Sequence, residues 1–202
     1  MYEVKCKQQE DQWYAEKLGK PSSSRFDEIL TASGTISKQR QGYMYELAAQ
    51  TVSGQYTPRY ITSAMEEGIS REAESRSLYE IINGVEVVQT GVIYPNKEKR
   101  YLCSPDGIIA GAYGLELKNV LPKTQVKYLL SGELPTEHVL QVQGSLLVTG
   151  FDRWDWMSYS PGLPVLLLTI TPNRELISKL EAALQDFAIE LALTVRKLKE
   201  MG

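Results

Sequence analysis

The chain has 202 residues, a length typical of one domain, and we expect a single domain over residues 1–202. Its net charge of −3 argues against a protein that coats nucleic acid non-specifically. Two cysteines exclude a disulfide framework and a cysteine-based metal cluster, and they favour a reducing compartment. No stretch approaches the roughly 20 apolar residues of a membrane span, and the polar start of the chain lacks a signal-peptide core. We therefore expect a cytoplasmic protein with no membrane partner.

The first third of the chain is predicted to be largely helical. Apolar residues at helical spacing and serines that can cap a helix indicate four helices. The pair Asn83-Gly84 ends the last of them, because this pair favours a turn. The predicted helices span residues 10–18, 23–32, 42–53 and 61–82.

From residue 85 onward the spacing of apolar residues changes to that of strands. Strands are predicted between 85 and 94 (one bent strand or a pair) and at 101–103, 107–110, 115–120, 154–159 and 165–171. Helices are predicted at 123–131, 136–148 and 174–201. This order of elements predicts an α/β fold, with a central sheet wrapped by helices.

Two carboxylates flank a glycine-rich turn in the middle of the chain. Asp106 and Glu116 each lie five positions from Gly111, so a hairpin centred there places them opposite each other. Directly opposed residues have Cβ atoms about 4.5–5.5 Å apart, where like charges repel. Strand alternation then puts Lys118 on the same face as Glu116. The segment therefore predicts a hard-cation site with an amine beside it.

This residue set suits the cleavage of phosphodiesters. Asp106 and Glu116, with the backbone carbonyl of Leu117, are oxygen ligands of the kind that Mg²⁺ or Mn²⁺ prefers. Lys118 would orient or deprotonate the attacking water, or neutralise developing charge. The alternative is a surface turn with an exposed Glu116–Lys118 ion pair. The apolar strand residues, such as Ile108, instead favour a hairpin in the core.

The two halves of this motif resemble a known nuclease signature. Ser-Pro-Asp-Gly at 104–107, followed by Gly-Leu-Glu-Leu-Lys at 114–118, looks like the PD-(D/E)xK pattern. More narrowly, it resembles the phage lambda exonuclease family, the YqaJ-like viral recombinases. The resemblance implies a restriction-endonuclease-like fold, with a central mixed β-sheet flanked by helices.

Further matches to this family are spread in the same order from about residue 10 to residue 170. No single one is decisive, but four short motifs in the right order make the resemblance strong. The matching segments are Trp13 to Gly19 with Ser22–Ser24, Gly68-x-x-x-Glu72, Gln141-Val142-Gln143, and Trp154 to Pro161.

The resemblance implies roles for two residues around the metal site. Glu72 would help to bind the metal directly or through water, whereas without the motif it reads as a solvated helix charge. Gln141 would lie near the metal or the attacking water. It falls near the apolar face of its helix, where a buried amide needs a partner.

The resemblance also implies a pocket for the 5′ end of DNA. Lys17 and Ser24 align with the basic and hydroxyl residues that engage this end, and Arg25 and Ser104 are further candidates. The matching basic position is typically Arg, and Lys cannot form the bidentate fork that Arg offers to a phosphate. The alternative for each residue is a helix cap or an ordinary surface side chain.

The function implied is a Mg²⁺-dependent exonuclease that digests the 5′-ended strand of duplex DNA and leaves 3′ tails for recombination. The resemblance further implies a homotrimeric ring, a single-strand-annealing protein as partner, and a phage or prophage origin in a bacterial host. A restriction-like or repair endonuclease on the same core stays open as an alternative. So does a DNA-binding module without activity, although the intact Asp106, Glu116 and Lys118 argue against it.

Overall fold

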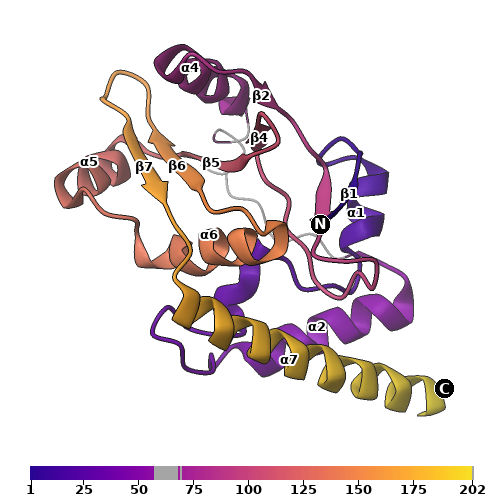
Figure 1. The fold of residues 1–202 in the computed structure, drawn as a ribbon. Coiled ribbons are helices and arrows are strands. Elements are labelled where there is room, and N and C mark those ends of the chain that lie inside the picture. Colours follow the sequence, from indigo (N-terminus) through magenta and orange to yellow (C-terminus); the bar gives the residue numbers. More distant parts are fainter. Residues whose placement is uncertain (57–67, 69, 202) are drawn as a thin grey trace.

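A computed structural model describes residues 1–56, 68 and 70–201, and a mixed β-sheet forms its centre (Figure 1). Within these residues the sheet has the strand order β2-β4-β5-β6-β7, in which β5 and β6 are parallel and the other neighbours are antiparallel. Helices flank the sheet, so the predicted fold class is confirmed. The strands are β2 (Val87–Val88), β4 (Gly107–Ile109), β5 (Tyr113–Asn119), β6 (Trp154–Tyr159) and β7 (Leu166–Ile170).

Two helices connect the parallel strands β5 and β6, since a parallel pair requires a crossover. These helices are α5 (Pro122–Ser131) and α6 (Thr136–Thr149). Helix α6 runs along one face of the sheet, and α4 (Glu72–Asn83) lies over the other face (Figure 1).

Strand alternation decides which residues face which helix. Leu115 and Leu117 of β5 pack in one apolar cluster with Tyr79 of α4. Trp154 and Trp156 of β6 pack in another cluster with residues of α6. Because successive side chains point to opposite faces of a strand, Glu116 and Lys118 face α6.

A second apolar core lies on the far side of α6 from the sheet. It joins α6 to α2 (Arg40–Ser53), to α7 (Arg174–Met201) and to a short 3₁₀ helix, η1 (Ser23–Glu28). Gly144 of α6 permits a close contact with η1, because a Cβ added there would lie 2.3 Å from the Phe26 ring. Helix α6 is therefore enclosed between the sheet and the helical layer.

The N-terminal segment forms a separate small unit of structure beside the sheet. Strand β1 (Tyr2–Val4) pairs antiparallel with β3 (Val92–Tyr94), and helix α1 (Asp11–Lys17) follows. Strand β1 was not expected from the sequence. Residues 101–103 do not form the predicted strand. Leu102 makes an isolated β-bridge to Ser22, and Cys103 makes one to Ile93.

The remaining elements mostly agree with the predictions. The helix predicted at 23–32 is wrong in type and length, because Arg25 has φ −133° and ψ 16°, which leaves a six-residue 3₁₀ helix. Residues 61–67 and 69 of the predicted helix 61–82 lie outside the described residues. The described part, α4, ends at Asn83, where Gly84 has φ +65° as the turn signal predicted.

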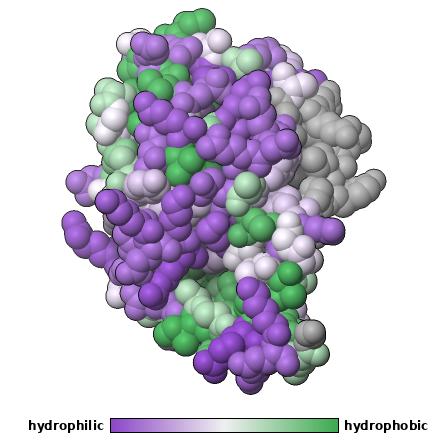
Figure 2. All heavy atoms as spheres, turned by 90° about the vertical axis from the view of Figure 1, so that its right-hand side faces the viewer, coloured by the Kyte–Doolittle hydropathy of each residue, from purple (hydrophilic) through white to green (hydrophobic). Residues whose placement is uncertain are grey.

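The face that carries the N-terminal segment and the end of α7 is largely hydrophilic (Figure 2). Hydrophobic spheres gather in its lower part (Figure 2). Ile189 and Leu193 of α7 are 55% and 43% exposed. These two residues line a cleft of about 690 Å³ along α7. Among the described helices, none is long and apolar enough to span a membrane.

Candidate active site

The β4–β5 hairpin sets the geometry of the two predicted carboxylates. Gly107 pairs with Leu115, so one step further Asp106 lies across from Glu116, as the sequence predicted. The turn between the strands places Ala110 at φ 50° and Gly111 at φ 67°. Positive φ angles are typical of tight hairpin turns, and this turn therefore fixes the register.

Three hydrogen bonds hold the carboxylates in place. Lys118 Nζ donates to Glu116 Oε1 at 2.6 Å, which confirms that the two side chains share a face. Gln141 Nε2 of α6 donates to the same oxygen at 2.6 Å. On the other carboxylate, Asp106 Oδ2 accepts from the backbone N–H of Leu117 at 2.7 Å. The hairpin and helix α6 therefore orient both acidic groups.

The electrostatics of the site indicate an excess of negative charge. Burial and then the charge of Glu116 raise the pKa of Asp106 well above its usual range, although Lys118 opposes this and Glu72 adds to it. Burial alone would lower the pKa of Lys118, but the charges of Glu116 and Asp106 outweigh it and raise the pKa. Lys118 therefore stays positively charged, and its single charge does not balance the negative charges of the surrounding carboxylates.

Glu72 reaches the edge of this group from the first turn of α4. Its side chain forms an ion pair with Arg76, one turn later on the helix. Ahead of α4, the Gly68 carbonyl accepts from Asn119 Nδ2 at 3.0 Å, which joins the helix start to the end of β5. The structure therefore brings the predicted Gly68–Glu72 motif to the site. This ion pair was not predicted from the sequence, although the i,i+4 spacing of Glu72 and Arg76 is typical of such pairs.

The side chains at the site supply only some of the oxygen ligands that a divalent cation needs. Within the described part of the chain, no three Asp, Glu, His or Cys side chains are already grouped as metal ligands. Asp106 and Glu116 are the pair whose mutual repulsion a cation would relieve. Further oxygens would come from the Leu117 carbonyl and from water, which Mg²⁺ usually retains.

Lys17 lies close enough to the site for its charge and that of Glu116 to act on each other. Its Nζ atom is 3.8 Å from the centre of the Trp13 ring. Burial and then the charge of Arg25 lower the pKa of Lys17 to about 8, against the opposing effect of Glu116. Helix α1 therefore brings an amine near the carboxylates of the hairpin.

The two predicted serines differ in what their hydroxyls already contact. Ser24 is exposed, and its Oγ lies 2.9 Å from Ser22 Oγ. Ser104 Oγ accepts from Trp13 Nε1 at 2.8 Å and donates to the Gly91 carbonyl at 2.6 Å. Ser104 therefore ties the segment just before Asp106 to α1 and to the turn before β3.

Arg25 already has two carboxylate partners in the folded chain. Its Nε donates to Glu28 at 2.8 Å, its Nη2 donates to Glu46 of α2 at 2.7 Å, and its guanidinium stacks 3.9 Å from the Tyr43 ring centre. These carboxylates occupy the donors that a phosphate would need. Arg25 therefore fixes η1 against α2, and its predicted contact with a DNA end would have to compete with these carboxylates.

Two other polar residues of α6 lie outside the site. Gln143 bonds the carbonyl of Thr171 at 3.0 Å and the N–H of Asn173 at 2.7 Å, so it joins α6 to the start of α7. His138 packs against the Tyr128 and Trp156 rings. Burial and then the charge of Lys118 lower its pKa to about 4, so it is neutral at pH 7. Of the two glutamines in the motif, only Gln141 reaches the carboxylates.

The fold and this site define an α/β protein in which a hairpin at the centre of a mixed sheet presents two carboxylates and a lysine. Residues 12–152 match the YqaJ-like viral recombinase domain, and the chain belongs to this family. The predicted family is thereby confirmed. Among curated protein sequences, none matches this chain.

Solved structures support the same placement. The alkaline exonuclease LHK-Exo from Laribacter hongkongensis is 28% identical, with a TM-score of 0.86 over 95% of this chain and 97% of that chain. A crystal structure of LHK-Exo in complex with dAMP matches equally well. A phage-related exonuclease from Haemophilus somnus 129PT shares the fold at 13% identity, with a TM-score of 0.67 over 91% of this chain and 96% of that chain.

Proposed function

We propose that the protein is a metal-dependent exonuclease that digests the 5′-ended strand of duplex DNA and leaves 3′ single-stranded tails for recombination by strand annealing. Membership of the YqaJ-like family and the likeness to LHK-Exo imply a DNA exonuclease. The observation that carries the proposal is the carboxylate of Glu116. It lies across the hairpin from Asp106, and Lys118 and Gln141 donate to the same one of its oxygens.

Mg²⁺ is the proposed cofactor, and Mn²⁺ is expected to substitute for it. Asp106, Glu116 and the Leu117 carbonyl would hold it, with Glu72 helping directly or through water. A bound divalent cation supplies polarisation of the scissile phosphate and lowers the pKa of a bound water. Carboxylates that hold a metal need fixed orientations, and the Leu117 N–H and the Gln141 amide would provide them here.

The side chains of the protein contribute the remaining chemistry. Lys118 stays protonated among the carboxylates, so its ammonium group can stabilise negative charge that develops on the phosphate oxygens. Its donors can also orient the water that attacks the phosphorus, because only one of its three hydrogens is needed for Glu116. Gln141 keeps the Glu116 carboxylate turned toward Lys118.

The preference for digestion from the 5′ end is proposed to come from a pocket for the terminal 5′ phosphate, formed by Lys17 and Ser24 with Ser104. A terminal phosphate carries more negative charge than an internal diester, so a cation beside the site favours it. The interaction of Lys17 with Glu116 supports this location, because it places the amine near the carboxylates. Ser104 lies two residues before Asp106, and its hydroxyl would turn from the Gly91 carbonyl to donate to the phosphate.

We propose that the protein acts as a homotrimeric ring around DNA, together with a single-strand-annealing protein, in the cytoplasm of a bacterial host. A ring accommodates the net charge of −3, because basic residues from several copies can converge on one channel. Exposed Ile189 and Leu193 beside the cleft on α7 form the type of apolar surface that a subunit contact covers.

A time course on linear duplex DNA labelled at either end tests the proposal. With Mg²⁺ we expect loss of the 5′ label as mononucleotides, faster on phosphorylated ends, and no cutting of closed circular DNA. Cutting of closed circles would favour the endonuclease alternative, since that enzyme needs no end. Digestion from 3′ ends would refute the proposed polarity, and no turnover on any duplex would favour a DNA-binding module.

A further inference from the structure

The face of the sheet opposite the candidate active site holds a buried carboxylate that the proposed chemistry does not use. Asp155 of β6 is fully buried. Arg153 donates to it at 2.9 Å from Nε and at 2.7 Å from Nη2, and Thr169 of β7 donates to it at 2.9 Å. The phenol of Tyr79, on α4, donates to it at 2.6 Å. One carboxylate therefore links α4 to two strands of the sheet.

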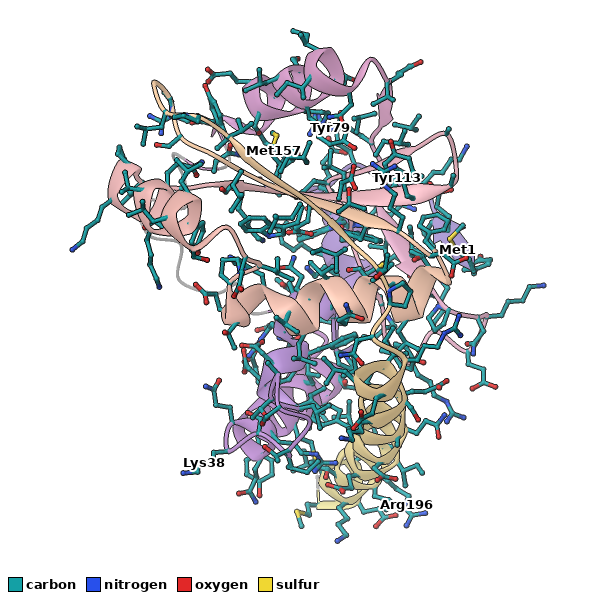
Figure 3. The ribbon with its side chains drawn as sticks, turned by 60° about the vertical axis from the view of Figure 1, so that its left-hand side comes forward. Met1, Lys38, Tyr79, Tyr113, Met157 and Arg196 are labelled. Atoms are coloured by element: carbon teal, nitrogen blue, oxygen red, sulfur yellow. The ribbon has the colours of Figure 1, made fainter. Side chains whose placement is uncertain are left out.

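The protonation states of this group make the bond from α4 a strong one. Burial and then the hydrogen bond to Asp155 raise the pKa of Tyr79, so the phenol keeps its proton. Burial alone would raise the pKa of Asp155, but the hydrogen bonds from Arg153, Tyr79 and Thr169 outweigh it and lower the pKa. A neutral donor on an ionised acceptor gives a charge-assisted bond. Figure 3 shows Tyr79 between α4 and the sheet, near Met157 and Tyr113.

Tyr79 and Glu72 lie on the same face of α4. They are seven residues apart, which is about two helical turns or roughly 10 Å along the axis. The position of Glu72 therefore follows from where Tyr79 anchors the helix on the sheet. A second bond, from the Tyr159 hydroxyl to the Glu74 side chain, holds the first turn of α4 to the end of β6.

We propose that Tyr79 and Asp155 are positioning residues that set the approach of Glu72 to the metal site. The inference rests on the proposed function, in which Glu72 binds the cation directly or through water. Asp155 itself lies on the opposite face of the sheet from Glu116, so it acts only through α4. Loss of the Tyr79 bond would let α4 shift on the sheet, and the carboxylate at its start would shift with it.

The test compares two variants that each remove one hydrogen bond from the same carboxylate. Tyr79→Phe removes the bond from α4, and Thr169→Val removes the bond from β7 without touching α4. Mn²⁺ binding to the full-length protein is measured by calorimetry without DNA, and amide exchange is measured along α4. We expect Tyr79→Phe to weaken Mn²⁺ binding about three- to tenfold, the range that one buried hydrogen bond supplies. It should also speed exchange in α4, while Thr169→Val leaves both within about twofold.

The outcomes distinguish failure of this inference alone from failure of the proposed function. Equal effects of the two variants, or unchanged Mn²⁺ binding in Tyr79→Phe, would overturn the inference and leave the Asp106–Glu116 site in place. No Mn²⁺ binding by the wild-type protein would overturn the proposed function and the inference together. If Tyr79→Phe does not fold, Tyr159→Phe carries the same expectation and the same contrary result, because it removes the bond that holds the first turn of α4 to β6.

Discussion

Replacing Lys17 by methionine should stabilise the protein while impairing its proposed function. Burial and then the charge of Arg25 lower the pKa of Lys17 from 10.5 to about 8. At about 1.4 kcal/mol per pKa unit, the charged form costs roughly 3 kcal/mol in the folded state. The contact of Lys17 with the Trp13 ring offsets about 1 kcal/mol of this cost. Lys17→Met should therefore raise the free energy of unfolding by about 2 kcal/mol at pH 7.

The pH dependence gives the sharper test. Because the folded-state pKa is the lower one, the cost is fully present below pH 8 and disappears as the pH rises through 10.5. Urea unfolding at pH 7 and at pH 10.5, at one protein concentration and with a chelator present, measures both points. The gain should be large at the first pH and nearly absent at the second. Lys7→Met is the matched control, because the Lys7 side chain is 81% exposed, and its stability should change by less than about 0.5 kcal/mol.

Two results would refute this reasoning. A loss of stability at pH 7 would mean that the Lys17 charge is well solvated or well paired in the folded protein. A gain that does not change with pH would mean that methionine packs better and that ionisation is irrelevant. With the same variant, the rate on 5′-phosphorylated ends should fall more than the rate on hydroxyl ends. Equal slowing on both substrates would make Lys17 a general contact to the DNA backbone.

Three further predictions concern the carboxylates and the cation. Asp106→Ala and Glu116→Ala should each abolish nuclease activity, by at least about 10³-fold, while circular dichroism shows a folded protein; near-normal turnover in either would remove that residue from the metal site. Lys118→Ala should lose turnover but keep Mn²⁺ and DNA binding, and calorimetry that shows loss of the metal would assign Lys118 to the structure of the site instead. Ca²⁺ should support DNA binding without cleavage, because it accepts larger and looser shells than Mg²⁺, and equal cleavage with Ca²⁺ would count against this site.

Much of the candidate site was determined by local sequence. The turn at Ala110 and Gly111 fixes the β4–β5 register, and the register alone places Asp106 across from Glu116. The two-residue period of a strand then places Lys118 beside Glu116. Backbone sterics and strand alternation act over a few residues, so these features can be read without knowledge of the rest of the fold.

The tertiary structure decided which distant residues join this hairpin and which do not. Gln141 reaches Glu116 because the crossover lays α6 against the sheet, and Lys17 approaches from the other end of the chain. Arg25 was a candidate from its position next to Ser24, whereas its partner Glu46 lies 21 residues away on α2. Such pairings depend on how helices pack against one another and on the cost of leaving a buried charge without a partner. Sequence spacing does not encode either of these. Only the folded chain therefore shows that Lys17 lies near the carboxylates and that Arg25 holds η1 to α2.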